Sequence, residues 1–154
     1  MCYSAMIVAD LLKLERHYGA QVDDAFYAQT VERRWWDGLA KMPKALDDAL
    51  LDRGGPAADW IGKLRKRRAD DLTQELFTQK RRVADAESAL QVKETEKARE
   101  DVRIGTDKMG KIQVALDDLR RKESKDRDFR IYPGMHTSVI VSKGGKRIIR
   151  PMRY

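Results

Sequence analysis

Cysteine and histidine are nearly absent from this chain of 154 residues. The one cysteine, Cys2, cannot form an internal disulfide or a zinc site built from several cysteines, so a reducing cytoplasm is the expected location. The two histidines, His17 and His136, are too far apart to match a metal-binding spacing. No glycine-rich phosphate loop, GxSxG elbow or HExxH motif occurs. We therefore expect no metal and no cofactor.

Long hydrophobic runs are also missing. No stretch of about 18 apolar residues occurs, so we expect no membrane span. The N-terminal segment has neither the basic region nor the long apolar region of a secretory signal.

Charge is abundant but unevenly distributed. Lysine and arginine number 32 against 25 acidic residues, a net charge of +7. Residues 59–128 mix both signs, which is typical of a solvated helical surface. Residues 129–154 contain no acidic residue at all, so this tail is the electropositive part of the chain.

The first third of the chain predicts one strand and three helices. Residues 2–7 are short and apolar, typical of a strand. Leucines at helical spacing predict a helix over 9–18 that ends at Gly19, and acidic residues at 23 and 24 suit the start of a helix that runs to about Trp36. Pro43 is tolerated in a first helical turn, so a third helix is expected over 43–52.

The middle of the chain predicts two helices that pack along heptad seams. Residues with a spacing of three and four form the first seam, and a second, weakened by Gly105 and Gly110, follows an interruption at 91–97. The two seams predict an antiparallel coiled-coil hairpin over 57–125 with its turn near 91–98, and one continuous helix is the alternative. The seams consist of Ala69, Leu72, Leu76, Gln79, Val83, Ala86 and Leu90, then Val102, Met109, Ile112, Leu116 and Leu119.

The tail predicts a β-hairpin. The β-branched run 137–141 and the return strand 147–154 flank Gly144-Gly145, a pair suited to the positive φ angles of a tight turn. A lone hairpin is marginally stable in water, and only one further strand is expected, so we expect the chain to be the N-terminal part of a longer sheet-containing core. The expected fold class is α+β, mostly helical.

Cys2 is the residue best suited to chemistry. Removal of Met1 would leave its α-amine and thiol on adjacent carbons, and such a 1,2-aminothiol condenses with an aldehyde and closes a thiazolidine ring. The alternative is that Cys2 is a small apolar residue at the start of a buried strand. Of Trp35 and Trp36 we expect one in the core and one exposed, with base stacking as a possible role.

Several blocks resemble a branch of the SOS response-associated peptidase (SRAP) family. They are Met1-Cys2-Tyr3-Ser4-Ala5, residues 42–47, residues 76–87, residues 130–134 and the final Pro151-Met152-Arg153-Tyr154. The resemblance spans the chain. It implies that residues 1–56 and 126–154 belong to an SRAP-type β core, with the helical hairpin of 57–125 as an insertion.

The resemblance also implies a function. Cys2 would be catalytic: after loss of Met1 it would crosslink to the aldehyde of an abasic site in single-stranded DNA, and the activity would include self-removal of Met1. Two features depart from the family. Tyr3 and Ser4 replace its usual Gly-Arg, and its asparagine, glutamate and histidine would lie beyond Tyr154.

The basic tail is the expected DNA contact, with Tyr132 and Tyr154 interleaved among its charges. Lysines that protect an exposed sheet edge are the plain alternative. A different functional class is a non-catalytic coiled-coil scaffold or nucleic-acid-binding adaptor, in which residues 57–125 bind a helical partner. The residues expected to contact DNA are Arg130, Lys146, Arg147, Arg150 and Arg153.

Overall fold

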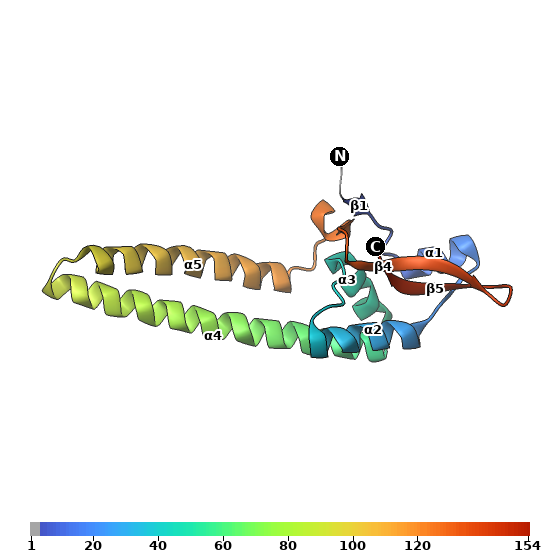
Figure 1. The fold of residues 1–154 in the computed structure, drawn as a ribbon, viewed down its shortest axis with the longest axis horizontal. Coiled ribbons are helices and arrows are strands. Elements are labelled where there is room, and N and C mark those ends of the chain that lie inside the picture. The colour runs from blue at the N-terminus through green and yellow to red at the C-terminus, as the bar shows by residue number, and fades with distance from the viewer. Residues whose placement is uncertain (1–3) are drawn as a thin grey trace. The chain divides into compact units, whose positions relative to one another are not determined.

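The computed structural model describes residues 4–154 and has an α+β fold that is mostly helical, as expected (Figure 1). It divides into two compact units. The core unit comprises Met1–Leu64 and Glu123–Tyr154, and the helical unit comprises Arg65–Lys122. In chain order the elements are β1 (Ala5–Met6), α1 (Leu11–Tyr18), β2 (Gln21–Val22), α2 (Asp24–Asp37), α3 (Lys44–Arg53), α4 (Pro56–Val92), α5 (Glu96–Arg120), the 3₁₀ helix η1 (Asp126–Phe129), β3 (Arg130–Ile131), β4 (His136–Lys143) and β5 (Lys146–Arg153).

Capping residues set the ends of the first two helices. The Asp10 carboxylate accepts a hydrogen bond from the Lys13 N–H at the start of α1, and the Asp23 carboxylate accepts one from Phe26 at the start of α2. Gly19 ends α1 in the left-handed conformation at φ 56°, which glycine adopts without steric cost. These local signals are why the predicted helix bounds agree with the structure.

The strands form two separate small sheets. In the first, β1 pairs antiparallel with β3, and in the second the order is β2-β5-β4, with β2 parallel to β5. The predicted hairpin is present, with Gly144 and Gly145 at positive φ in its turn. Of the strand predicted over residues 2–7, the strand β1 comprises Ala5–Met6. It pairs with β3 and does not join the hairpin formed by β4 and β5. The strand β2 was not predicted, because two residues carry no detectable alternation.

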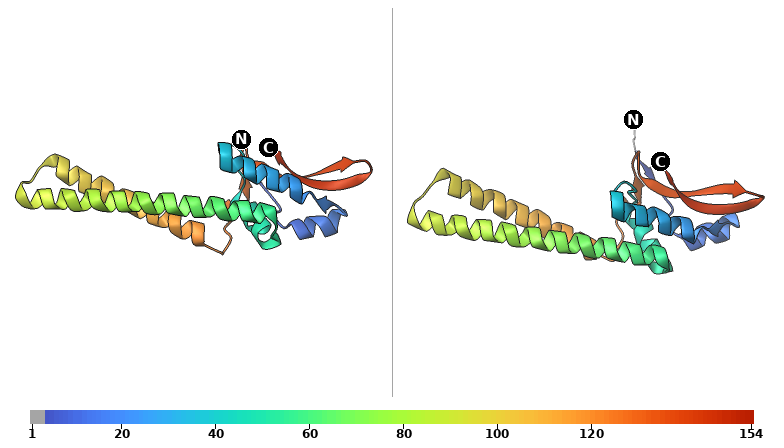
Figure 2. Two further views of the ribbon diagram at one scale, coloured as in Figure 1. Left: turned by 90° about the horizontal axis from the view of Figure 1, so that it is seen from below. Right: turned by 60° about the horizontal axis from the view of Figure 1, so that its bottom comes forward.

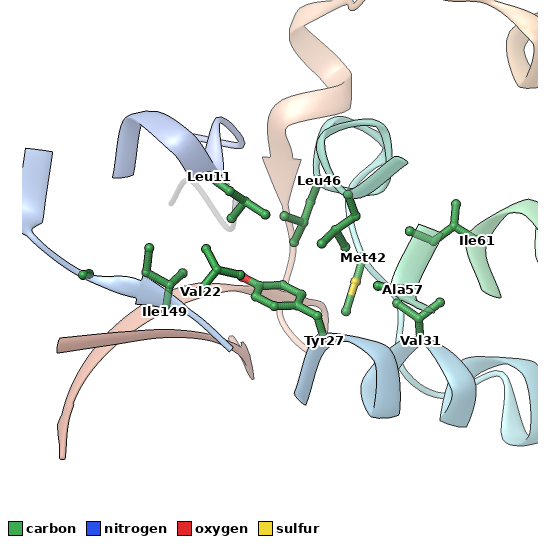
Figure 3. Close-up of a cluster of buried hydrophobic side chains, with 11 residues drawn as sticks. Leu11, Val22, Tyr27, Val31, Met42, Leu46, Ala57, Ile61 and Ile149 are labelled. Atoms are coloured by element: carbon green, nitrogen blue, oxygen red, sulfur yellow. The ribbon is translucent and has the colours of Figure 1, made fainter. Parts of the chain in front are cut away.

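The interior of the core unit is a cluster of apolar side chains around Tyr27 (Figure 3). Helix α2 contributes Tyr27 and Val31, and β5 contributes Ile149; all three side chains are fully buried. The Tyr27 hydroxyl donates a hydrogen bond to Ser138 Oγ at 2.7 Å, which joins α2 to β4. Burial raises the pKa of Tyr27 to about 12, so the phenol is neutral at ordinary pH.

The helical unit consists of the rest of α4 and α5, which run antiparallel in all views (Figures 1 and 2). Leu72 of α4 is buried with Ile112 and Leu116 of α5. The connection between α4 and α5 comprises residues 93–95, within the turn region predicted from the sequence. Its last residue, Thr95, caps α5 by accepting a hydrogen bond from the Ala98 N–H.

The units divide at 64/65 and 122/123, whereas the sequence suggested 57 and 125. The first turns of α4 stay with the core unit because Ala57 and Ile61 pack in its apolar cluster. Because α4 continues without a break through residue 64, the sequence contains no local signal that its packing partner changes from the core unit to α5.

Candidate nucleic-acid interface

Cys2, the predicted catalytic residue, lies outside the described residues, but the segment that follows it is placed. Ala5 and Met6 of β1 pair with Ile131 and Arg130 of β3. Arg130 Nη1 donates a hydrogen bond to Ser4 Oγ at 3.3 Å. The Arg130 guanidinium of the basic tail is therefore hydrogen-bonded to a residue that follows the predicted nucleophile, Cys2, by two positions in the sequence.

Arg150 has a carboxylate partner within the core unit. Its Nη2 lies 2.6 Å from Asp23 Oδ2, and its Nε donates to the same oxygen at 2.7 Å. Its guanidinium also lies 4.9 Å from the centre of the Phe26 ring. Burial tends to raise the pKa of Asp23, but the Phe26 N–H and Arg150 outweigh it and hold that pKa below the usual value. The charge of Arg150 is thus largely compensated, and its contacts tie β5 to α2.

Lys146 and Arg147 lie at the turn end of the hairpin. Arg147 donates a hydrogen bond to the Tyr18 carbonyl at 2.8 Å, and both residues line a shallow pocket with the segment 18–21. A strand advances about 3.4 Å per residue, so Arg147 and Arg153 lie about 20 Å apart along β5. The structure therefore spreads the five predicted contacts along β5 and onto β3 rather than gathering them in one cluster.

Arg153 lies at the other end of β5, directly opposite His136 of β4. A side chain at Gly134 would meet the Arg153 guanidinium, since a Cβ there would lie 3.6 Å from Arg153 Nη2. The backbone N–H of His136 donates a hydrogen bond to the Lys41 carbonyl at 2.7 Å, which anchors this end of the hairpin to the segment after α2.

His136 is in an unusual polar environment. Its Nδ1 is buried and has no hydrogen-bond partner. Burial lowers the pKa of His136, and the positive charges of Arg153 and Arg33 lower it further, against the opposing effect of the Lys41 carbonyl. No sequence pattern groups Arg33 with His136, because the two are about a hundred positions apart.

The same end of α2 exposes an aromatic side chain. Trp36 is 73% exposed and follows Arg33 by three residues, so both lie on one face of the helix. Trp35 is half-buried and lies 6.1 Å from Trp60, centre to centre. Trp36 is therefore exposed as expected, whereas Trp35 is half-buried and is not part of the apolar cluster of the core unit.

Within residues 4–154, no group of three or more histidine, cysteine or acidic side chains is arranged to hold a metal ion. No helix of that same part of the chain is long and apolar enough to cross a membrane. Comparisons with protein-family profiles, curated proteins and solved structures find no match to this chain.

Proposed function

We propose that this chain is a sensor of abasic sites in single-stranded DNA that acts in the cytoplasm as part of an SRAP-type protein of the DNA-damage response. The observation that carries the proposal is the position of Cys2 directly after the initiator methionine, within blocks that resemble that family. The hydrogen bond between Arg130 and Ser4 supports it, because it provides a cation near this segment for the DNA phosphates.

The proposed chemistry has two stages. Hydrolysis of the bond between Met1 and Cys2 consumes one water and releases methionine, which leaves a free α-amine on Cys2. That amine then adds to the open-chain aldehyde of an abasic deoxyribose and expels one water, giving an imine. The Cys2 sulfur adds to the imine carbon, and its proton passes to the nitrogen, so the product is a thiazolidine. Because ring closure is intramolecular, it is strongly favoured over attack by an external thiol.

The test is the intact mass of the protein after incubation with a single-stranded oligonucleotide that carries one abasic site. The expected product has the summed masses of the oligonucleotide and the Met1-free chain, less one water. The same oligonucleotide with an intact base is the control for the aldehyde.

Cys2→Ala is the matched variant for the sulfur. Because Cys2 would take part in the self-removal of Met1, the variant is prepared without Met1; its free α-amine should then form an imine that is captured only when a hydride reductant is present. Retention of Met1 in the fully expressed protein, or a stable adduct of Cys2→Ala without reductant, would contradict the mechanism.

The alternative function, a non-catalytic scaffold or nucleic-acid-binding adaptor, has one observation in its favour. Phe77 and Val114 of the helical unit are about two-thirds exposed, at 68% and 67%, so each offers apolar surface to a partner. This alternative predicts no adduct with abasic DNA under any condition.

A further inference from the structure

We propose that Arg33, His136 and Arg153 together bind a backbone phosphate of single-stranded DNA, with Trp36 stacking on a neighbouring base. This site deepens the proposed function and takes its ligand class from it. It differs from the sequence-based prediction, in which the contacts ran along the whole hairpin and included neither α2 nor His136.

The hairpin register supplies the first part of the argument. His136 and Arg153 are directly opposite each other, and such cross-strand neighbours point to one face with Cβ atoms about 5 Å apart. Ser138 shares that face, because side chains alternate along a strand, and Ser138 contacts Tyr27 of α2. The face that carries His136 and Arg153 is therefore the one turned toward α2, the helix that carries Arg33.

The charge of this cluster is not neutralised. Two arginines that lie near the interior of the core unit have carboxylate partners: Arg34 binds Asp47, and Arg53 binds Glu15 and Asp24. Among residues 4–154, neither Arg33 nor Arg153 has such a partner. A carboxylate one helical turn beyond Arg33, that of Asp37, instead accepts a hydrogen bond from the Leu39 N–H at 2.8 Å.

His136 provides an independent indication of a missing ligand. Buried polar atoms in proteins nearly always have a hydrogen-bond partner, and His136 Nδ1 has none. A phosphate oxygen near the two guanidinium groups would accept a hydrogen bond from a protonated Nδ1 once the His136 ring turns to expose that atom. The bound negative charge would also oppose Arg153 and Arg33, the groups that lower the pKa of His136 in the free protein.

Trp36 makes a single strand the best-suited form of the ligand. Its exposed ring is on the same face of α2 as Arg33, and an unpaired base can stack on it whereas a base within a duplex cannot. The C-terminal end of β5 and β1 also lie on one side of the core unit (Figures 1 and 2). A strand held at Arg153 would thus lie on the same side as the segment that follows Cys2.

The binding test uses the Cys2→Ala protein and a labelled undamaged single strand, so no covalent step contributes. Fluorescence anisotropy is measured over a range of salt concentrations. Arg33→Gln and Arg153→Gln should each weaken binding about tenfold at low salt and reduce the magnitude of the slope of log K against log salt by up to about one, since both contact a single phosphate. Trp36→Ala should weaken binding about tenfold with little change in that slope.

Arg16→Gln is the matched control, since it removes one exposed arginine from α1 of the same unit and should leave binding within about twofold. Circular dichroism verifies that each variant is folded. The site would be wrong if Arg33→Gln and Arg153→Gln bind as well as the control. It would also be wrong if Arg147→Gln alone reproduced the loss, because the hairpin turn would then be the contact surface.

A second measurement does not depend on the arginine variants. The imidazole resonances of His136 are titrated with pH by NMR, with and without the undamaged strand. The pKa of His136 should rise on binding, because the bound negative charge opposes the two arginines that lower it in the free protein. An unchanged His136 titration at saturating DNA would overturn the site. Failure of this site would leave the proposed crosslinking by Cys2 unaffected, because crosslinking is measured separately with the parent protein. Conversely, a parent protein that binds DNA normally but forms no crosslink would refute only the proposed covalent function.

Discussion

Substitution of Gly105 by alanine tests how closely the two helices of the helical unit approach. A Cβ at Gly105 would lie 2.5 Å from Val83 Cγ2, well inside the normal separation of about 3.5–4.0 Å between two carbon atoms. The valine cannot easily move aside, because a β-branched side chain in a helix is largely confined to one rotamer. Glycine at this position therefore lets α5 pack directly against α4.

The expected free energy change has two parts of opposite sign. Alanine is favoured over glycine inside a helix by about 1 kcal/mol. Forcing a methyl group into a packed interface costs about 1–3 kcal/mol. Gly105→Ala should therefore leave the stability of the helical unit unchanged or lower it by up to about 2 kcal/mol. Gly110 of the same helix has nothing within 4 Å of a notional Cβ, so Gly110→Ala should stabilise the unit by about 1 kcal/mol.

Urea unfolding followed by far-UV circular dichroism measures both variants. A double-mutant cycle with Val83→Ala isolates the contact: in that background the clash is removed, so Gly105→Ala should become stabilising. The reasoning is refuted if Gly105→Ala alone stabilises the protein as much as Gly110→Ala does.

Two further predictions concern the core unit. Tyr27→Phe removes the hydrogen bond to Ser138 and should lower the free energy of unfolding by about 1 kcal/mol in urea; in the parent, absorbance titration should show one tyrosine that ionises with a pKa of about 12. The pKa of Asp23 is lowered from 3.8, so its carboxylate stabilises the fold above that pH, and this contribution is lost as the pH falls through the lower native pKa. Asp23→Asn should be less stable than the parent at neutral pH and should lose less stability on acidification, as measured by thermal melts. Equal acid sensitivity of the two proteins would contradict the role assigned to the ion pair with Arg150.

Much of the secondary structure could be predicted because its signals are local. The glycines at 19, 38 and 54 each follow the last residue of a helix, and Gly144-Gly145 fixes the turn of the hairpin. The heptad spacing likewise identified side chains that are buried in the helical unit, among them Leu72 and Leu116. Each of these features depends on residues a few positions apart.

The pairing of strands could not be predicted in the same way. The partner of Ala5–Met6 is about 125 positions away in sequence, and β2 is defined only by its parallel register with β5. Two-residue strands have no periodicity of their own. Their existence depends on the tertiary packing that brings the two segments together.

The basic tail shows why counting charges does not locate a binding surface. In sequence, Arg150 and Arg153 are equivalent members of a segment that lacks acidic residues. The fold makes them different: Asp23, 127 positions away, compensates the charge of Arg150. Arg153 instead lies opposite His136, where the charge of Arg33 also acts. A phosphate is attracted by charge that no carboxylate has already neutralised, so the affinity for DNA should depend more on Arg153 than on Arg150, although the two are equivalent in the sequence.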